Sequence, residues 1–199
     1  MGRRRSMRPI LIGLTGRARS GKTTAAEHLA QTYLLEQYAF ADPLRDGLMA
    51  IFNLDPTDFE GDRKEQPLGW LDCSPRQLMQ SMGTEWARNT VHPDVWVKLA
   101  EQNLEYMTKA LGAVLGFVVS DVRFENEADL IRRRGGTVIH ILRPNALAVN
   151  PHISEAGIAA NSADLTLPNY GTVEGFLRSL DEVFLMIRER HQRAELKSA

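Results

Sequence analysis

The sequence predicts an α/β fold built on a mostly parallel sheet of about five strands. The candidate strands are short, continuous apolar runs such as PILIGLT (9–15) and TVIHIL (137–142), a pattern typical of strands buried on both faces. They alternate with segments that carry helical apolar stripes, and this alternation is typical of parallel sheets covered by helices. With 199 residues, 43% of them hydrophobic and 25% charged, the chain has the composition of one ordinary globular domain.

The first third of the chain predicts two strands and one helix. The strand at 9–15 leads into a helix over 22–34, whose apolar stripe is formed by Ala26, Leu29, Ala30, Tyr33 and Leu34. Residues 38–43 (YAFADP) look like a second short strand that ends at Pro43, because proline has no N–H to donate. Residues 53–73 mix proline, glycine and charges, which indicates a mobile loop region.

Residues 74–77 (SPRQ) predict the start of a helix. Ser74 can be the N-cap, Pro75 occupies the first helical position, and Gln77 completes a capping box. We expect this helix to run to about Asn89 and to be followed by another over 94–111.

The last third predicts three strands and two helices. A strand at 117–122 (FVVSDV) precedes a helix that begins near Glu125 and ends at RRRGG (132–136), where arginines and glycines are ordinary stop signals, so the run Arg132–Arg134 is interpreted as structural. Strands at 137–142 and 163–169 follow. The final helix has a stripe formed by Phe176, Leu177, Leu180, Val183, Phe184 and Ile187.

The turn GRARSGKT (16–23) matches the pattern GxxxxGK[ST] between a strand and a helix. In such a loop the backbone N–H groups point at phosphate oxygens, and the helix N-terminus adds positive potential. Lys22 can reach the β- and γ-phosphates, and Thr23 can offer its hydroxyl to Mg²⁺. Arg19 either supports the triphosphate or is simply solvated. The motif predicts a P-loop NTPase fold, a three-layer α/β/α arrangement that binds a nucleoside triphosphate.

The phosphate loop does not reveal what receives the phosphoryl group. GTPases, motors, packaging ATPases and small-molecule kinases all carry it. The chain is too short for most motors, and it lacks the base-reading sequence Asn-Lys-x-Asp of GTPases.

Candidate acceptor and metal residues follow the predicted strands. In parallel sheets ligands bind beyond the carboxyl ends of the strands, which is where Gly16, Asp42 and Asp121 are predicted to lie. Asp121 and Arg123 in VVSDVRFENEAD (118–129) could orient a metal, grip phosphate, or pair with each other. The acids that follow them suit the first turns of a helix and are interpreted as mainly structural: Glu125, Glu127 and Asp129.

The helix predicted at 74–89 carries a polar row. Its members, spaced four apart, are Arg76, Gln80, Thr84 and Arg88. The row could be a solvated face or a phosphate-binding row, since arginine forks suit phosphates. The residues two positions after the members of this row are apolar, and they predict the side of the helix that packs against the rest of the protein: Leu78, Met82 and Trp86. Trp96 could stack on a base or belong to the core.

Composition excludes several other roles. The net charge of −1 argues against bulk electrostatic binding of nucleic acid, and no apolar run is long enough to span a membrane. The single cysteine, Cys73, allows no internal disulfide, and no Cys/His spacing indicates zinc. Residues 1–8 are expected to be a disordered basic leader; they fit the loose myristoylation pattern, but the apolar run after them is too short for a signal peptide.

Five stretches together resemble the deoxynucleoside monophosphate kinases of tailed bacteriophages. They are GRARSGKTTAAEHL, FADPLRDGL, SPRQLMQSMGTEWAR, VVSDVRFENEADLIRRRGGTVIHILRP and NYGTVEGFL, spread from about residue 9 to residue 185. The layout is also similar to phosphomevalonate kinase and, more distantly, to dephospho-coenzyme A kinase. The resemblance implies transfer of phosphate from ATP to a deoxynucleoside monophosphate for DNA precursor synthesis. The alternatives are a kinase for another small phosphorylated acceptor and a P-loop ATPase without an acceptor.

The resemblance also implies roles for individual residues. The catalytic residues would be Lys22, Asp42, Asp121 and Arg123, and Mg²⁺ would lie at Thr23 and Asp121. The ATP-binding residues would be Gly16, Arg19, Ser20, Gly21, Lys22, Thr23, Thr24, Arg143 and Asn169, the last near the adenine. The acceptor-binding residues would be Asp42, Arg45, Arg76, Gln80, Arg88, Trp96 and Arg123.

One departure from the family pattern concerns the lid. Related kinases have an arginine-rich lid, whereas the lid-like segment at 143–160 offers Arg143 with His152 and Glu155. More of the charge neutralisation would then rest on Arg19, Arg88 and Arg123.

The expected organisation is a kinase domain at 9–188, whose part at about 43–112 is helical and binds the acceptor, followed by a polar tail at 189–199. The expected partners are small-molecule nucleotides, with no stable nucleic-acid or membrane binding. A homodimer and a cytoplasmic location are compatible with the resemblance.

Overall fold

The computed structural model describes residues 8–112, 114–144 and 157–197. The chain forms two compact units, which are described separately. The phosphate-loop unit comprises the chain up to Ala39 and from Leu104 onward, and the helical unit comprises Phe40–Asn103. Most of the predicted leader (1–8) and most of the lid-like segment (143–160), including His152 and Glu155, lie outside the described residues.

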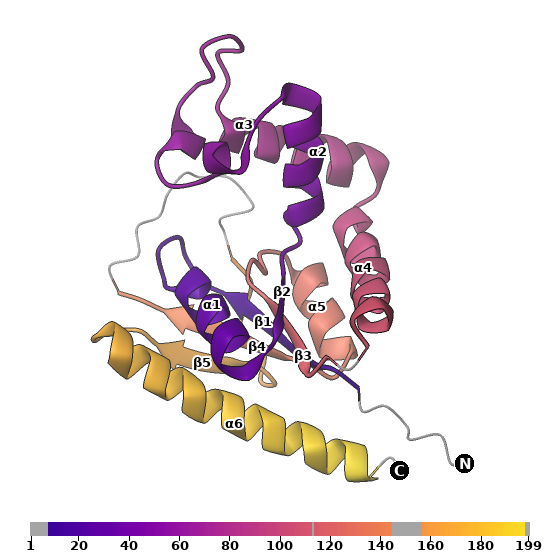
Figure 1. The fold of residues 1–199 in the computed structure, drawn as a ribbon, viewed down its shortest axis with the longest axis vertical. Coiled ribbons are helices and arrows are strands. Elements are labelled where there is room, and N and C mark those ends of the chain that lie inside the picture. The colour runs from indigo at the N-terminus through magenta and orange to yellow at the C-terminus, as the bar shows by residue number, and fades with distance from the viewer. Residues whose placement is uncertain (1–7, 113, 145–156, 198–199) are drawn as a thin grey trace. The chain divides into compact units, whose positions relative to one another are not determined.

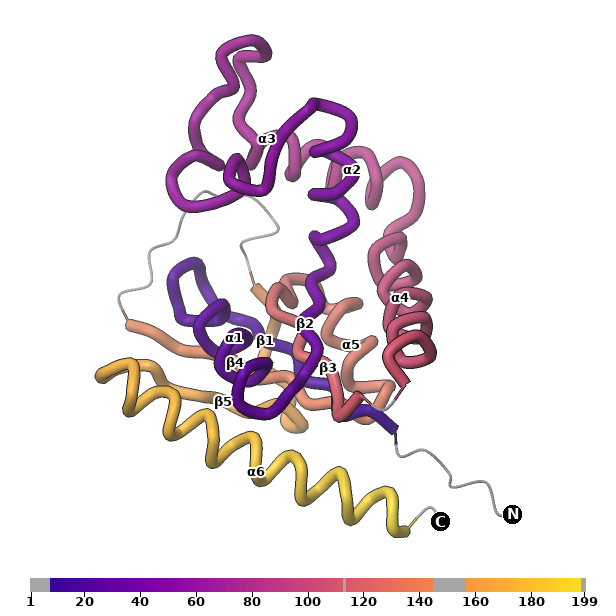
Figure 2. Tube along the Cα trace, viewed as in Figure 1, coloured from indigo at the N-terminus to yellow at the C-terminus, as the bar shows by residue number. Residues whose placement is uncertain are grey.

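The phosphate-loop unit is built on a five-stranded parallel sheet in the order β2-β3-β1-β4-β5, which can be followed in Figure 2. The strands are β1 (Ile10–Thr15), β2 (Glu36–Tyr38), β3 (Gly116–Val119), β4 (Thr137–Leu142) and β5 (Leu165–Pro168). All six residues of β1 are buried, because this central strand is covered on both faces. The predicted α/β class, with about five mostly parallel strands, is confirmed.

Helices cover both faces of this sheet, which gives the three-layer α/β/α arrangement (Figure 1). On one face, α1 (Lys22–Tyr33) and α6 (Val173–Lys197) bury Leu29, Leu180 and Phe184 against the strands. On the other face, Ile131 of α5 (Glu125–Arg133) packs over β1 at Gly13. The apolar stripe predicted for the last helix is buried or half-buried, and that helix continues to Lys197.

Two strand predictions need correction. Strand β2 ends at Tyr38, and residues Asp42 and Pro43 begin helix α2 (Asp42–Phe52) instead of ending a strand. The reason is that proline has a helix-ready φ and is tolerated in the first turn, where an acid also suits the helix dipole. Strand β3 ends at Val119, so Asp121 lies two residues beyond it.

Another correction concerns Leu34, which was predicted in the apolar stripe of the first helix. The helix ends at Tyr33, and Leu34 adopts a left-handed conformation (φ 56°) as its C-cap. Its side chain is therefore turned away from the core and is 77% exposed.

The helical unit consists of α2, two short 3-10 turns (Pro56–Phe59 and Arg63–Glu65), α3 (Pro75–Gln80), the π-helix η3 (Ser81–Val91) and the start of α4 (Val95–Leu111). The capping box predicted at SPRQ is confirmed. The Ser74 hydroxyl accepts from the Gln77 N–H at 3.2 Å, and the Gln77 Oε1 accepts from the Ser74 N–H at 2.8 Å.

The packed side predicted for this helix is confirmed only in part. Leu78 is buried and Met82 is half-buried, but Trp86 is 53% exposed. The change from α to π geometry at Ser81 rotates later side chains away from their α-helical directions, so Gly83 and Ala87 are buried in this part of the helix instead. Across the described part of the chain, no helix combines the length and hydrophobicity needed to cross a bilayer.

Candidate active site

The phosphate loop lies between the end of β1 and the start of α1, as the sequence predicts (Figure 1). Three of its residues have positive φ angles: Gly16 (146°), Arg19 (62°) and Gly21 (108°). This conformation is unfavourable for a residue with a side chain, so Arg19 must be held by its surroundings. The turn places the first residues of α1, Lys22 and Thr23, at the helix N-terminus, where backbone N–H groups favour anions.

Lys22 folds back over the loop. Its Nζ donates to the carbonyl oxygens of Gly16 (2.7 Å) and Arg17 (2.9 Å). Within the loop, Ser20 is 1% exposed, and its Oγ is a buried polar atom without a hydrogen-bond partner. Buried hydroxyls are normally paired, so this atom marks a place where the loop has unused hydrogen-bonding capacity.

Asp121 is positioned by a short extended segment that joins two strand ends. The Ser120 N–H donates to the Tyr38 carbonyl at 3.1 Å, and the Val122 N–H donates to the Leu14 carbonyl at 3.1 Å. Asp121 therefore lies between the carboxyl ends of β2 and β1, at the edge where the phosphate loop begins. The sequence placed Asp121 at this edge correctly, although the strand that carries it ends earlier than predicted.

Glu127 locks the turn that carries Arg123. This carboxylate is 2% exposed and accepts from the backbone N–H groups of Arg123 (2.7 Å) and Phe124 (3.1 Å). The sequence identified Glu127 only as an acid suited to the helix start, and the structure adds a direct capping role. The backbone of Arg123 is thus fixed next to Asp121.

The chemistry of the side chains at this edge fits a hard divalent cation. Thr23 supplies a hydroxyl and Asp121 a carboxylate, and both are oxygen donors. Mg²⁺ prefers such donors and usually takes its remaining ligands from phosphate oxygens and water. Thr23 and Asp121 are therefore suitable to hold Mg²⁺ together with a nucleotide.

Two residues that follow other strands contact the phosphate loop. After β4, the Arg143 Nη1 donates to the Arg19 carbonyl at 3.3 Å. After β5, the Asn169 Nδ2 donates to the Ser20 carbonyl at 2.8 Å. Both residues were assigned to ATP by resemblance, and both lie against the loop that would hold its phosphates.

In the helical unit, the candidate arginines have partners within the unit. Arg45 pairs with Asp42 at 3.0 Å, and Arg76 pairs with Glu65 at 2.6 Å. Arg88 is 9% exposed and donates to the Pro93 carbonyl at 3.2 Å. These three cations are therefore held by protein groups in the structure.

The π-helix keeps the predicted polar row together. In an α-helix, side chains four apart drift by about 40° per step, because each turn has 3.6 residues. A π-helix has more residues per turn, so the same spacing drifts in the opposite sense. The change at Ser81 therefore keeps the four residues closer to one line along the helix. Arg88 is buried, and the other three are half-buried: Arg76, Gln80 and Thr84.

Two further candidates lie on this unit. The Gln80 Nε2 is a buried amide nitrogen without a hydrogen-bond partner, which is an unusual condition for a donor. Trp96 donates its indole Nε1 to the Gly83 carbonyl at 2.8 Å and is half-buried. This bond fixes the indole against the π-helix, whichever of its two predicted roles applies.

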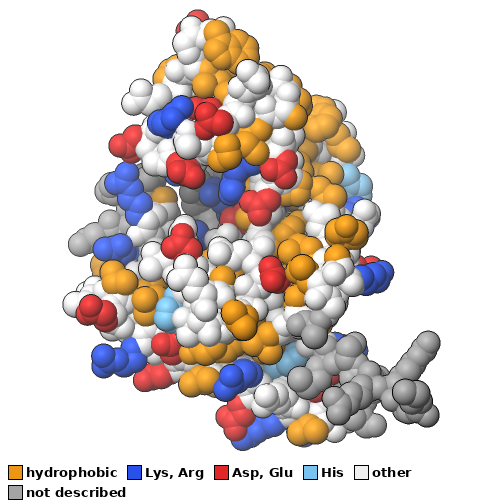
Figure 3. All heavy atoms as spheres, in the orientation of Figure 1, with side chains coloured by type: hydrophobic (Ala, Val, Ile, Leu, Met, Phe, Trp, Pro, Cys, Tyr) orange, Lys and Arg blue, Asp and Glu red, His pale blue; other side chains and the backbone are white. Residues whose placement is uncertain are grey.

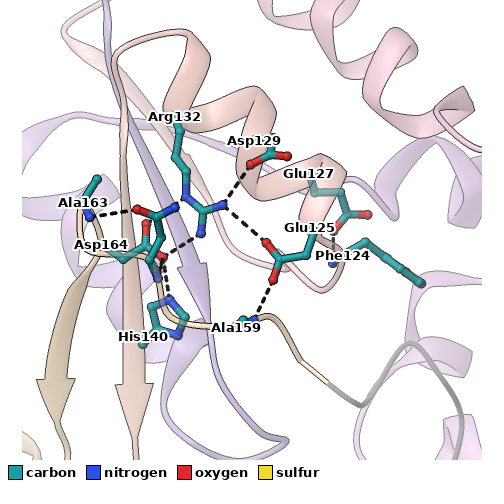
Figure 4. Close-up of polar contacts among 10 residues, drawn as sticks. Phe124, Glu125, Glu127, Asp129, Arg132, His140, Ala159, Ala163 and Asp164 are labelled. Carbon is teal, nitrogen blue, oxygen red and sulfur yellow. Dashed lines mark hydrogen bonds and ion pairs between the residues drawn. The ribbon is translucent and has the colours of Figure 1, made fainter.

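A buried ionic cluster beside α5 was not predicted from the sequence (Figure 4). Arg132 binds both carboxylate oxygens of Asp164, with Nε–Oδ1 at 2.9 Å and Nη2–Oδ2 at 2.7 Å, and His140 lies 2.9 Å from the same Oδ2. Arg132 also contacts Asp129 and Glu125. Arg132 was correctly interpreted as structural, but nothing in the sequence indicated that its partner would be 32 residues away.

The Asp164 carboxyl has a strongly perturbed pKa. Its side chain is only 2% exposed, and burial alone would raise the pKa. Hydrogen bonds from Arg132, His140 and the Asn161 N–H outweigh burial and lower the pKa to about 2. Hydrogen bonds that Arg132 donates to Asp164, Asp129 and Glu125, opposed by burial, raise the pKa of Arg132. The Arg132–Asp164 pair is thus charged at neutral pH.

Charged side chains of both signs are interspersed on the face shown in Figure 3. This pattern agrees with the nearly balanced composition of 24 basic and 25 acidic residues. Any binding of phosphates by this chain would therefore depend on local positive groups and not on the net charge.

Comparison with known proteins identifies relatives over most of the chain. A family model described as deoxynucleotide monophosphate kinase matches residues 70–180. A putative deoxynucleotide monophosphate kinase of Acanthamoeba polyphaga mimivirus is 35% identical over 185 residues, which cover 84% of this chain and 92% of that protein. The deoxynucleotide monophosphate kinase of Enterobacteria phage T4 is 28% identical over 228 residues, with 82% and 94% covered.

Solved structures show a more distant likeness. A gluconokinase from Sinorhizobium meliloti 1021 superposes with a TM-score of 0.47 at 14% sequence identity, covering 96% of this chain and 98% of that one. Such a distant match does not bear on the substrate.

Proposed function

The chain belongs to the deoxynucleotide monophosphate kinase family, and from this premise we propose which of its residues bind ATP and which bind the acceptor. The protein is a phosphotransferase that moves the γ-phosphoryl group of ATP to the 5′-phosphate of a deoxynucleoside monophosphate, giving ADP and a deoxynucleoside diphosphate. Such a product serves DNA precursor synthesis.

The observation that carries the assignment is the phosphate loop at the end of β1. Its backbone conformation, the start of α1 and the Lys22 ammonium supply one positive pocket for a triphosphate. In this proposal ATP is held by Gly16, Arg19, Ser20, Gly21, Lys22, Thr23, Thr24, Arg143 and Asn169.

The charge that develops during transfer is neutralised from the same edge of the sheet. Lys22 exchanges its bonds to the loop carbonyls for the β- and γ-phosphates, and Arg123 extends to the transferring group. Mg²⁺, held by Thr23 and Asp121, supplies Lewis-acid neutralisation of the phosphate oxygens when it is bound. Lys22, Asp42, Asp121 and Arg123 are the proposed catalytic residues.

The acceptor is bound by the helical unit through side chains. Its phosphate oxygen is already anionic, so no strong general base is needed, and catalysis consists mainly of positioning and charge neutralisation. The proposed acceptor-binding residues are Asp42, Arg45, Arg76, Gln80, Arg88 and Trp96, with Arg123 from the phosphate-loop unit.

Release of ADP across a panel of acceptors tests the function. We expect turnover with at least one of dAMP, dGMP, dCMP and dTMP, and only background release without an acceptor. Two further arms, phosphomevalonate and dephospho-coenzyme A, test the related kinases. Turnover with one of these and none with any deoxynucleotide would replace the assignment. ADP release that is independent of every acceptor would instead indicate an ATPase.

A further inference from the structure

Asn169 is fixed at both its backbone and its side chain. Its N–H donates to the Leu142 carbonyl at 2.7 Å, which ties it to the end of the neighbouring strand β4. Its side-chain Nδ2 donates to the Ser20 carbonyl at 2.8 Å, which ties it to the phosphate loop. The residue therefore connects the sheet to the loop through two hydrogen bonds.

The phosphate loop needs such support because of how its backbone is arranged. When N–H groups turn inward toward phosphate, the carbonyl groups turn outward and need donors of their own. Lys22 supplies donors to Gly16 and Arg17, and Arg143 supplies one to Arg19. Asn169 completes the set at Ser20, and it is the only one of these three side-chain donors that is uncharged.

The carbonyl that Asn169 binds lies in the most strained part of the loop. Ser20 stands between two residues with left-handed backbones, Arg19 (φ 62°) and Gly21 (φ 108°). A left-handed backbone is unfavourable for a residue other than glycine and persists only where contacts hold it. The Asn169 bond is directly adjacent to both of these residues.

Packing behind the loop confirms the closeness of the contact. A Cβ atom on Gly21 would lie 2.7 Å from the Asn169 Nδ2 and 3.5 Å from the Phe176 ring. Asn169 and Phe176 thus occupy the space where a side chain at position 21 would be. These two residues therefore pack directly against the loop at Gly21.

We propose that Asn169 is a positioning residue for the phosphate loop and acts on the triphosphate of the donor nucleotide rather than on its base. It holds the Ser20 carbonyl so that the N–H groups next to it remain directed at the phosphates. The proposal rests on the ATP-binding role proposed for the loop. A contact with adenine would instead use the second Nδ2 hydrogen or the Oδ1 of Asn169, since Ser20 takes only one of the two Nδ2 hydrogens.

Binding of three Mg²⁺ complexes to the wild type and to Asn169→Asp distinguishes these two roles. The ligands are ATP, GTP and inorganic triphosphate, which has no base. The Asp side chain has the same shape but cannot donate when ionised, so it tests the bond with little change in packing. We expect all three ligands to bind about tenfold more weakly or worse, by a common factor, because one hydrogen bond is lost and an acceptor faces an acceptor.

The kinetic readout separates positioning from a general structural defect. We expect kcat/KM to fall by the same factor with ATP and with GTP as donor, while the KM of the deoxynucleoside monophosphate stays within about twofold. Asn169→Ala should behave similarly, and Tyr170→Ala, a 65% exposed neighbour in the same turn, should match the wild type.

Two results would overturn the proposal. A loss confined to ATP, with GTP and triphosphate unchanged, would show that Asn169 reads the base. Unchanged binding of all three ligands in both Asn169 variants would show that the bond to Ser20 is dispensable. If the wild type itself bound no triphosphate, the proposed role of the loop would fail instead, which is a separate outcome.

Discussion

The phosphate-loop unit and the helical unit hold their candidate phosphate-binding groups in different ways. In the phosphate-loop unit the groups are mainly backbone N–H donors, and the loop carbonyls are already bound by Lys22, Arg143 and Asn169. In the helical unit the groups are arginine side chains, and each has a protein partner, such as Glu65 for Arg76.

This difference indicates that the triphosphate of ATP and the phosphate of the acceptor would be bound in different ways. A backbone pocket is set by folding and is available before ATP arrives, so little is reorganised on binding. An arginine that is paired with a partly exposed carboxylate can exchange that partner for phosphate at small cost, since such pairs contribute about 0–1 kcal/mol. Glu65 is 41% exposed, which suits this exchange. In the proposed assignment, the backbone of the donor site is therefore preorganised apart from Lys22, whereas the acceptor site would depend on side-chain rearrangement.

The largest loss of activity is expected for Lys22→Ala in the phosphate loop. The variant loses the charge proposed to reach the β- and γ-phosphates together with two hydrogen bonds to loop carbonyls. We expect kcat/KM to fall by about 100- to 1000-fold, the range seen when one charge-stabilising donor is removed from an active site. Steady-state kinetics with saturating acceptor measures the loss, and thermal unfolding confirms that the sheet remains folded.

Lys109→Ala is the matched control for this variant. Lys109 is 79% exposed and makes one long pair with Glu105 at 3.9 Å, so its removal should leave activity and stability almost unchanged. Retention of substantial kinase activity by Lys22→Ala would remove the phosphate loop from the centre of the mechanism.

The helical unit is tested by Arg76→Lys, which keeps the positive charge but loses the planar fork. We expect the KM of the deoxynucleoside monophosphate to rise by about tenfold, because a bidentate phosphate contact becomes a single one. The KM of ATP should stay within about twofold. Both constants come from the same ADP-release assay, with each substrate varied in turn.

Arg63→Lys supplies the comparison within the same unit. Arg63 is also ion-paired, with Asp58 at 2.7 Å, but it is 62% exposed and lies outside the polar row. Its substitution should leave both KM values unchanged. An equal rise in the KM of ATP and the KM of the acceptor in Arg76→Lys would contradict the proposal that the phosphate-loop unit binds ATP and the helical unit binds the acceptor.

The sequence predicted the phosphate-loop unit better than the helical unit, for a physical reason. Apolar runs and the glycine pattern of GRARSGKT follow from local backbone requirements, so they are readable from neighbouring residues. Strand β4 and the start of α1 coincide with their predicted bounds. Strand β2 was placed too late, because the local signal of Pro43 fits a strand end and a helix start equally well.

The contacts that hold the site were harder to predict, because they join residues that are distant in the chain. The bond from Asn169 to Ser20 spans 149 positions, and the pair of Arg132 with Asp164 spans 32. The π-helix was also missed, since the residues of SMGTEWARNTV (81–91) fit an α-helix as well. Side-chain partners of this kind depend on the tertiary fold, which periodicity alone does not define.

The smallest expected effect concerns the buried cluster of the phosphate-loop unit and its stability in acid. The folded pKa of Asp164, about 2, lies below its ordinary value of 3.8. Its contribution is therefore fully present above about pH 4 and is lost as the pH falls toward 2, because the unfolded chain binds the proton first. The shift corresponds to about 2 kcal/mol in total, of which about 1 kcal/mol is lost between pH 5 and pH 3. Urea unfolding at these two pH values measures it.

Asp164→Asn removes the titratable carboxyl group while keeping the shape of the side chain. We expect the variant to be less stable at pH 7, since Arg132 loses a charged partner that is only 2% exposed, and to lose about 1 kcal/mol less than the wild type between pH 5 and pH 3. Asp129→Asn is the control, because Asp129 contacts the same arginine but is 59% exposed, and it should retain the acid sensitivity of the wild type. Identical acid profiles for Asp164→Asn and the wild type would mean that the carboxylate is not held ionised by its neighbours.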